Sequence, residues 1–503
     1  MTDVALGLPK LLTGIPGFDS ITNGGLPLHR TSLLSGTAGS AKTVFGCQFL
    51  ASGIEQFGQS GVFVTFEEPP VDIRRNMRGF GWDIEAWEAA GKWAFVDVSP
   101  QLTDDTVIGG EYDLGALLAR MENAVRKVGA QRLVMDSLGA VFTQIAQSKI
   151  VRNEMLRITT ALKKLGVTSI LTAERTEEFG AIARYGIEEF VTDNVVVLRN
   201  ILDDEKRRRT MEILKFRGTD HQKGEYPFTI HPRDGIIVLP LSALELKQQS
   251  TDLRITSGNQ VLDDMCGGGF FRDSVILVSG ATGTGKTLTV TQFVNGGAAI
   301  GERCLLFAFE ESREQLFRNA RGWGLDFHEL EKSGCLRVIC RYPEVAGLED
   351  HLVSMKAEID EFKPNRVAVD SLSALERVGN SKGFREFVIG LTSFIKHHEM
   401  AGLFTATTPT LLGGASVTEA HISTITDSIL LLRYVEMYGV MRRGMTVLKM
   451  RGSMHDKEIR EVSIDSAGMH IGSPFRNVSG ILAGVPVHAS EREIARLNDL
   501  FGQ

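Results

Sequence analysis

Short apolar runs alternate with segments of helical periodicity along this chain of 503 residues. In the first half, runs that are too apolar to alternate predict strands buried on both faces: Ser32 to Gly36, Gly61 to Glu68, Trp93 to Ser99, Arg132 to Ser137 and Thr168 to Glu174. Between them lie helical windows such as 153–166, whose apolar positions return roughly every turn at Met155, Leu156, Ile158, Leu162 and Leu165. We therefore expect an α/β fold, with a mainly parallel sheet flanked by helices.

The pattern changes to paired strands near the end of each half. In the first half the strands are 194–200 and 210–218, with a turn expected over 203–209. In the second half they are 428–436 and 445–452. The same order of elements therefore occurs twice.

The amino-acid sequence itself is also repeated. FVTFEEP corresponds to LFAFEES, RNMRGFGW to RNARGWGL, RLVMDSLGA to RVAVDSLSA, and LKFRGTDH to LKMRGSMH. We predict a first domain over 1–240, a linker over 241–256, a second domain over 257–476 and a C-terminal tail over 477–503. The first copy alone contains the polar insert 99–113, for which a partner-binding loop and a loop without a role are equal alternatives.

Composition restricts the class of protein. The chain is 43% hydrophobic and 23% charged, carries a net charge of -7, and has room for at least two cores. We expect a cytoplasmic protein, because no apolar run reaches bilayer length and the first residues do not resemble a secretion signal. The five cysteines lack metal-ligand spacing and are expected to be reduced, and the acidic balance makes nucleic acid an unlikely partner.

Two stretches match the phosphate-binding P-loop, in which backbone N–H groups face phosphates, a lysine reaches the terminal phosphates and a Thr hydroxyl ligates magnesium. Residues 279–287 read SGATGTGKT, the complete pattern, whereas residues 35–43 read SGTAGSAKT, with Ala41 in place of its second glycine. Ala41 keeps its N–H donor, so we expect a working loop with a corner that costs about 1–2 kcal/mol if its backbone is left-handed. A glycine-rich turn that binds nothing is the alternative. The predicted loop residues are Gly36, Thr37, Ala38, Gly39, Ser40, Ala41, Lys42 and Thr43, and Gly280, Thr282, Gly283, Thr284, Gly285, Lys286, Thr287 and Leu288.

Acidic residues end two kinds of predicted strand near these loops. Glu67-Glu68 and Glu310-Glu311 follow the strand after each P-loop helix, where a carboxylate can position a nucleophile for phosphoryl transfer. Asp136 and Asp370 each end a later apolar strand. This is the position of a Walker-B acid, which holds the magnesium ion and its water ligands. We expect a magnesium ion at each site, held with the help of Thr43, Asp136, Thr287, Glu310 and Asp370.

At this point the chain resembles a known family. GTAGSAKT and GATGTGKT, FEE twice, HISTITDS and LKMRGSMHDK, in this order over nearly the whole chain, are similar to the KaiC family of bacterial circadian-clock ATPases. The resemblance implies tandem RecA-like P-loop domains that form a homohexamer with ATP between neighbouring subunits. It implies slow ATP hydrolysis by the first domain, and in the second an autokinase and autophosphatase that transfers phosphate to its own Ser and Thr and back to ADP.

The resemblance also implies residue roles. Glu68 would lead water activation in the first domain and Glu310 would be the base for the acceptor hydroxyl in the second, with Glu67 and Glu311 in support. Trp323 would lie near the second nucleotide base. Residues that would reach the nucleotide of the adjoining subunit are Lys215, Phe216, Arg217, Thr219 and His221, and Arg443, Lys449, Met450, Arg451, Ser453 and His455.

The phosphate acceptors implied are Ser423 and Thr424, with Thr418 as an accessory threonine. Internal alignment places Glu189 and Phe190 at the corresponding positions of the first half, so only the second half offers hydroxyl groups there. Without the other motifs, these residues read as an ordinary Ser/Thr-rich loop before a strand. A timer ATPase, circadian or hourglass, is therefore favoured over a DNA-dependent RecA-like motor or a nucleotide-regulated scaffold.

Two further segments bear on partners. Lys206 to Arg209 (KRRR) is expected to be a solvated turn or subunit edge rather than a nucleic-acid patch. The tail, with a Ser490-x-x-Glu493 capping box and an apolar stripe, predicts a short terminal helix. This tail differs from that of the best-known family members, so a KaiA-like stimulator is doubtful, whereas a KaiB-like partner on the first domain remains an expectation.

Overall fold

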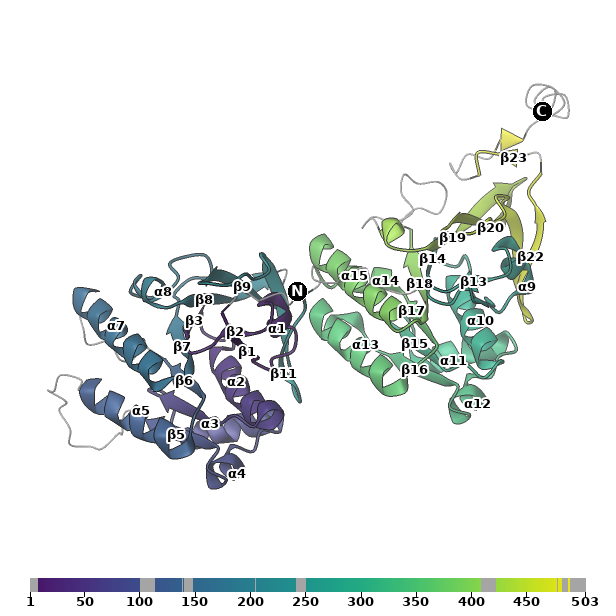
Figure 1. The fold of residues 1–503 in the computed structure, drawn as a ribbon. Helices are drawn as coiled ribbons and strands as arrows, with labels where there is room; N and C mark the ends of the chain where they lie inside the picture. The colour runs from purple at the N-terminus through teal and green to yellow at the C-terminus, as the bar shows by residue number, and fades with distance from the viewer. Residues whose placement is uncertain are drawn as a thin grey trace, which may run out of the picture. The chain divides into compact units, whose positions relative to one another are not determined.

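The computed structural model describes residues 8–99, 114–137, 139, 148–203, 205–240, 250–408, 422–476, 478–481 and 487–488. The chain divides into two compact units, Met1–Leu244 and Glu245–Gln503, which are described here one at a time (Figure 1). The predicted insert 99–113, apart from Ser99, the first part of the linker, Thr418 and the terminal helix lie outside the described residues.

The first unit contains one large sheet and a small two-stranded one. Its elements are β1 (Lys10–Leu11), α1 (Phe18–Ile21), β2 (Leu26–Pro27), β3 (Thr31–Gly36), α2 (Lys42–Phe57), β4 (Gly61–Thr65), α3 (Pro70–Met77), α4 (Ile84–Ala89), β5 (Trp93–Asp97), α5 (Leu114–Val128), β6 (Arg132–Asp136), α7 (Ser148–Leu165), β7 (Thr168–Glu174), α8 (Glu188–Val191), β8 (Asn194–Asp203), β9 (Lys206–Phe216), β10 (Glu225–His231) and β11 (Gly235–Val238). The large sheet has nine strands in the order β11-β10-β9-β8-β3-β7-β6-β4-β5. Strands from β8 to β5 in this order are parallel, and β9, β10 and β11 extend the sheet with antiparallel pairs.

The second unit repeats this plan. Its elements are β12 (Arg254–Ile255), α9 (Gln260–Met265), β13 (Phe270–Phe271), β14 (Val275–Gly280), α10 (Lys286–Ala298), β15 (Cys304–Ala308), α11 (Arg313–Gly322), α12 (Phe327–Lys332), β16 (Leu336–Cys340), α13 (Leu348–Phe362), β17 (Arg366–Asp370), α14 (Leu372–Glu376), α15 (Ser381–His397), β18 (Ala401–Thr407), β19 (Ser428–Met437), β20 (Val440–Met450), β21 (Arg460–Asp465), β22 (Gly468–Pro474), β23 (Val478–Ser479) and β24 (Val487–His488). Its large sheet has the order β16-β15-β17-β18-β14-β19-β20-β21-β22, which is the strand order of the first sheet written from the opposite edge. The predicted α/β fold, with two tandem domains of mainly parallel sheet, is confirmed.

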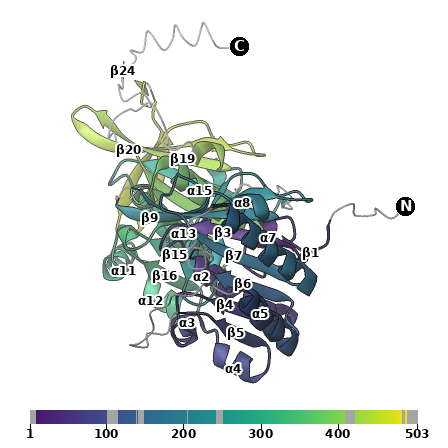
Figure 2. The same ribbon diagram turned by 90° about the vertical axis from the view of Figure 1, so that its left-hand side faces the viewer.

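Each sheet is covered by helices on both faces. In the first unit α5 and α7 lie on one face and α2 on the other, and in the second unit α13 and α15 lie opposite α10 (Figures 1 and 2). Neighbouring strand residues point to opposite cores: Leu33 packs with the α5 and α7 side, and Leu34 packs with the α2 side. This explains why the strands read as continuous apolar runs.

The structure corrects two details of the sequence prediction. Leu156 was expected on the apolar stripe of α7, but it is 45% exposed, whereas Met155, Ile158 and Leu162 are buried. The predicted turn 203–209 is shorter, because Asp203 pairs with Lys206 and KRRR begins strand β9. Antiparallel pairing with β8 therefore extends the hairpin further than its charged sequence indicated.

Two general findings complete the fold. Among the described residues, no helix is both long and apolar enough to cross a bilayer. All five cysteines are free, and Cys47, Cys266 and Cys304 are buried in the cores.

Candidate nucleotide-binding sites

The first P-loop connects buried strand β3 to helix α2, which begins at Lys42. The ammonium group of Lys42 donates to the carbonyl oxygens of Gly36 and Thr37, each at 2.9 Å. Burial lowers the pKa of Lys42, while neighbouring carboxylates, led by Glu174, act in the opposite direction. The loop thus holds its lysine at the start of a helix, where the helix dipole also favours an anion.

Ala41 has a left-handed backbone, with φ 76° and ψ 26°. An alanine in this conformation costs about 1–2 kcal/mol relative to glycine, which is the strained corner that the sequence allowed for. Ala41 packs against the core on the α2 side of the sheet, so its methyl group also gains apolar contact.

The end of strand β6 places Asp136 beside this loop. Its Oδ2 accepts a hydrogen bond from the hydroxyl of Thr43 at 2.6 Å, and its Oδ1 accepts one from Thr172. A Thr hydroxyl and a carboxylate in contact are the protein groups that P-loop enzymes use around magnesium. The predicted pair from distant parts of the sequence is therefore adjacent in the fold.

The two glutamates after β4 have different surroundings. Glu67 is exposed and its Oε1 accepts from the hydroxyl of Ser137 at 2.8 Å. Glu68 is half-buried, and its Oε1 accepts from the amide of Asn76 at 2.6 Å. Burial and the nearby charge of Asp136 raise the pKa of Glu68, which makes its carboxylate a stronger base.

These residues line one pocket of about 340 Å³, at the carboxyl ends of the parallel strands. It is bounded by the loop residues Ala38, Gly39, Ser40, Ala41, Lys42 and Thr43, by Val44, Thr65, Glu67, Glu68, Asp136 and Ser137, and by Glu174 at the end of β7. Sequence reasoning missed Ser137, Asn76 and Glu174. The first two lie in segments that recur in the second half, DSLGA with DSLSA and RNMRG with RNARG, and that recurrence was the available signal.

The second P-loop has the same construction. The ammonium group of Lys286 donates to the carbonyl oxygens of Gly280 and Ala281, each at 3.0 Å, and burial lowers its pKa. Gly285, with φ 111°, stands where Ala41 stands in the first loop. Leu288 is buried in the core, and Thr284 donates to the carbonyl of Ala281, so these two predicted loop residues support the backbone.

The acidic residues of the second unit repeat the first arrangement. Asp370 is buried and receives hydrogen bonds from Thr405 and Thr287, and burial raises its pKa. The hydroxyl of Ser371 donates to Glu310 at 2.9 Å, and Asn319 donates to Glu311 at 3.1 Å. Burial, with the charge of Asp370, raises the pKa of Glu311. Glu310 thus corresponds to Glu67, and Glu311 to Glu68.

Magnesium fits the donor chemistry of both sites. Asp136 with Thr43, and Asp370 with Thr287, offer hard oxygen ligands, and magnesium in phosphate sites commonly takes one or two protein oxygens with substrate and water. Within the described residues there is no group of three or more His, Cys, Asp or Glu that could hold a metal by itself. An ion at these sites would therefore depend on phosphate oxygens.

The residues predicted to reach a neighbouring nucleotide lie around the ends of β9 and β20. In the first unit Lys215 donates to the carbonyl oxygens of Glu189 and Thr192, Phe216 is buried beside His221, and Arg217 and Thr219 follow the strand. Burial lowers the pKa of Lys215.

The corresponding residues of the second unit divide into two places. Arg443 donates to the carbonyl of Gly283 in its own P-loop, at 3.1 Å. Lys449 and Arg451 donate to backbone oxygens of Thr426 and Thr424. Met450 is buried, Ser453 accepts from Arg254, and His455 follows at the surface; Trp323 packs against the core after α11.

The predicted acceptor segment 422–424 forms a single helical turn. Thr424 is exposed, as an acceptor must be. In the first unit Phe190 occupies the corresponding place in α8 and is 66% exposed.

Comparison with known proteins agrees with this geometry. A family model described as "ATPase: KaiC" matches residues 11–243 and 255–475, one match for each unit. The chain is 68% identical to a circadian clock protein KaiC3 of Synechocystis sp., over 99% of this chain and 98% of that protein. It is 55% identical to a circadian clock oscillator protein KaiC of Thermosynechococcus vestitus, over 97% and 94% of the two chains. With the corresponding protein of Synechococcus elongatus the identity is 52%, over 98% and 94%.

Proposed function

The chain belongs to the KaiC family of ATPases, and on that premise we propose that its first unit hydrolyses ATP while its second transfers phosphate from ATP to Ser423 and Thr424. The family resemblance inferred from the motifs is confirmed, and the relatives are circadian-clock proteins. The DNA-dependent motor is not favoured by these relatives. The division of labour between the units is our proposal.

The observation that carries the proposal is a difference between two otherwise matching sites. Both units have a buried P-loop lysine, an aspartate bonded to a P-loop threonine and a pair of glutamates held by serine and asparagine. Only the second unit has hydroxyl residues, Ser423 and Thr424, where the first has Glu189 and Phe190. A site without an acceptor side chain is left with water as its nucleophile.

The proposed chemistry follows from these groups. In the first unit Glu68 accepts a proton as water attacks the terminal phosphorus of ATP, and the bond to the ADP oxygen breaks. In the second unit Glu310 accepts the proton of the Ser423 or Thr424 hydroxyl, and the phosphoryl group passes to that oxygen. The reverse transfer returns it to ADP. Magnesium, when bound, would offset the phosphate charge, and Lys42 and Lys286 would contact the terminal phosphates.

We further propose a homohexamer with nucleotide at the subunit boundaries, because several predicted contact residues lie away from their own P-loop. Lys449 and Arg451 lie against the acceptor segment, so the acceptor would meet the nucleotide of a neighbouring copy. A KaiB-like protein is the proposed partner of the first unit, and a KaiA-like stimulator remains doubtful. Free cysteines are consistent with a cytoplasmic location, which we also propose.

Intact-mass measurement after incubation with ATP and magnesium tests the proposal. The native chain should gain one or two phosphate groups, and the variant with Ser423→Ala and Thr424→Ala should gain none while still releasing ADP. Peptide mass spectrometry over residues 418–424 would locate the phosphate and include Thr418. Native chain without added mass would contradict the kinase proposal, and hydrolysis that needs single-stranded DNA would favour the motor.

A further inference from the structure

An aspartate precedes β8 in the first unit and β19 in the second, and the two differ in their burial and in their cationic partners. In the first unit Asp193 pairs with Arg30 at 3.2 Å and with Lys163 at 2.9 Å. Arg30 directly precedes β3, and Lys163 lies in α7. The carboxylate of Asp193 is 3% exposed, so both cations contact a well-enclosed charge.

In the second unit the corresponding residue is Asp427. Lys396 in α15 takes the place of Lys163 and lies 2.8 Å from the carboxylate. The residue that directly precedes β14 is Ser274, so a short hydroxyl side chain replaces Arg30. The second cation is instead Arg451, which follows β20 and lies 3.6 Å from Asp427.

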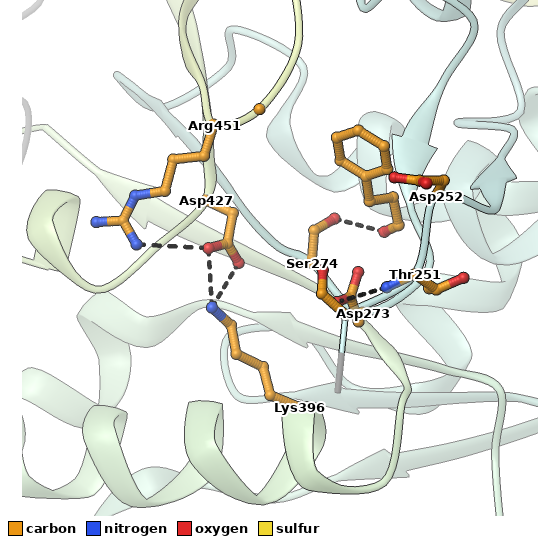
Figure 3. Close-up of a pocket in the computed structure, with 10 residues that line it drawn as sticks. Thr251, Asp252, Asp273, Ser274, Lys396, Asp427 and Arg451 are labelled. Atoms are coloured by element: carbon orange, nitrogen blue, oxygen red, sulfur yellow. Dashed lines mark hydrogen bonds and ion pairs between the residues drawn. The ribbon is translucent and has the colours of Figure 1, made fainter. Parts of the chain in front are cut away.

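The change from arginine to serine coincides with a cavity. A pocket of about 370 Å³ is bounded by Ser274, Lys396, Asp427 and Arg451, together with Ser250, Thr251, Asp252, Phe271, Asp273 and Gly452. Figure 3 shows Arg451 and Lys396 approaching the carboxylate of Asp427 from two different directions, with Ser274 beside it. The Asp427 side chain is 17% exposed, compared with 3% for Asp193, as expected where a long side chain has been replaced by a short one.

The position of Arg451 matters because its guanidinium has a second partner. While Nη1 faces Asp427, Nη2 donates to the backbone oxygen of Thr424 at 2.8 Å. Asp427 is itself fixed, since its Oδ2 accepts from the backbone N–H of Val275 at 2.9 Å. Arg451 therefore connects the acceptor segment to the start of strand β14, by a hydrogen bond to Thr424 and a longer ion pair with Asp427.

We propose that Arg451, held by Asp427 and given room by Ser274, is a positioning residue for the phosphate acceptors of the second unit. This inference rests on the proposed function, because it concerns how Thr424 and Ser423 are presented for transfer. Lys449 donates to the backbone oxygen of Thr426, and its counterpart Lys215 donates to that of Thr192. The lysine contact is therefore common to both units and does not distinguish the second from the first. The arginine contact to Asp427 is the part that replaces the Arg30 contact of the first unit.

Transfer between a hydroxyl and a phosphorus atom depends steeply on their separation and alignment. Thr424 is the residue whose carbonyl Arg451 contacts, so its hydroxyl should be affected more than that of Ser423. Within one chain Arg451 contacts the backbone oxygen of Thr424 and the carboxylate of Asp427, so its positioning effect acts through the backbone. Its proposed contact with the nucleotide of a neighbouring copy is separate, and amide exchange measured without ATP reports the positioning effect alone.

The test restores the first-unit arrangement in the second unit. In Ser274→Arg, the new guanidinium should occupy the pocket, pair with Asp427 and displace Arg451. We expect the initial rate of phosphate incorporation at Thr424 to fall about tenfold, with a smaller loss at Ser423. Hydrogen exchange of amides 422–427, measured without ATP, should become faster. Hydrolysis by the first unit should not change.

Three further variants complete the design. Asp427→Asn keeps the size of the side chain but weakens the hold on Arg451, and should shift the Thr424 to Ser423 ratio in the same direction even if Ser274→Arg does not fold. Ser274→Ala should behave as the native chain. Arg30→Ser makes the converse change in the first unit and should leave both acceptors unaffected.

The outcomes separate the two proposals. If the native chain gains no phosphate, the proposed function fails, whatever the exchange data show. If the native chain is phosphorylated and both Ser274→Arg and Asp427→Asn keep its rates, ratio and exchange, the positioning role of Arg451 is overturned. An equal loss in Arg30→Ser would also overturn it, because the effect would then be a general loss of stability.

Discussion

The terminal methyl of Met469 lies close to Gly285: a Cβ at that glycine would be 2.9 Å from Met469 Cε, so the methyl group would have to move aside. The same Cβ would be 3.1 Å from Ile464 Cδ1. Each unit has a hairpin whose turn ends at a glycine: Gly235 pairs with His231 in the first unit, and Gly468 pairs with Asp465 in the second. The residue after this glycine is Met469 in the second unit and Ile236 in the first. We expect this shorter side chain to leave more room for the methyl group of Ala41 in the first P-loop.

Gly285→Ala should therefore destabilise the second unit by about 2 kcal/mol, from left-handed strain and overpacking against Met469. Denaturant unfolding of the full chain, followed by fluorescence, would measure it. Adding Met469→Ile should recover part of the loss. As the matched control, Ala41→Gly should change stability by less than about 1 kcal/mol, because relief of strain is offset by a more flexible unfolded chain. Equal effects in the two loops would contradict this explanation.

Asp136→Asn should weaken the contribution of magnesium to nucleotide binding in the first unit. The substitution removes the charge while leaving a carbonyl oxygen to accept from Thr43, which now lies 2.6 Å from Asp136 Oδ2. Calorimetric titration with ATP, with and without magnesium, should show the enhancement by magnesium falling about tenfold or more at this site. Lys286→Met in the background isolates the first site. An unchanged enhancement would exclude Asp136 from the magnesium shell.

Asn76→Ala should shift the pH dependence of ATP hydrolysis. The Asn76 hydrogen bond lowers the pKa of Glu68, opposing the upward effect of burial and of Asp136, so its removal raises that pKa further. A base must be deprotonated to act, so the acidic limb of the rate profile should move to higher pH. Asn319→Ala, the equivalent change in the second unit, should leave this limb where it is. A limb that does not move would argue against Glu68 as the base.

Glu310→Gln should stop phosphorylation while ATP hydrolysis by the first unit continues, because the amide cannot take the hydroxyl proton. Mass measurement and phosphate release on the same sample would check both. In the first unit we expect Glu68→Gln to lower hydrolysis more than Glu67→Gln. A larger loss in Glu67→Gln would show that the corresponding glutamates, Glu67 and Glu310, act as the base in the two units. These two are alike in structure, because Ser137 donates to Glu67 as Ser371 donates to Glu310.

Much of this architecture could be predicted from the sequence, because each apolar run between helical windows is a strand covered on both faces. β7 extends over Thr168–Glu174, the predicted run, and the P-loop signature fixed both the strand before it and the helix after it. The charged start of β9 was misread as turn, since local composition carries no information about pairing with β8. Leu156 was misplaced because periodicity of roughly one turn does not separate adjacent positions on a helix.

For the sites, the sequence supplied the reacting groups but not their supports. Ser137 and Asn76 are residue types that carry no chemical signal by themselves. Only the fold shows that Ser137 contacts the carboxylate of Glu67 and Asn76 that of Glu68. The exchange of Arg30 for Arg451 as partner of the buried aspartate was also invisible, because the two arginines are distant in sequence and come from different strand ends.

The fit between Gly285 and Met469 also restricts the substitutions by which the sequence of one repeat can become more similar to that of the other. A glycine at this corner leaves room for Met469, whereas a Cβ there would come within 2.9 Å of its terminal methyl group. A change from the glycine loop to the alanine loop should therefore cost less if the hairpin side chain becomes shorter first. Recombination that copied the first loop alone into the second repeat would place a Cβ close to Met469, whereas transfer of loop and hairpin together would avoid that contact.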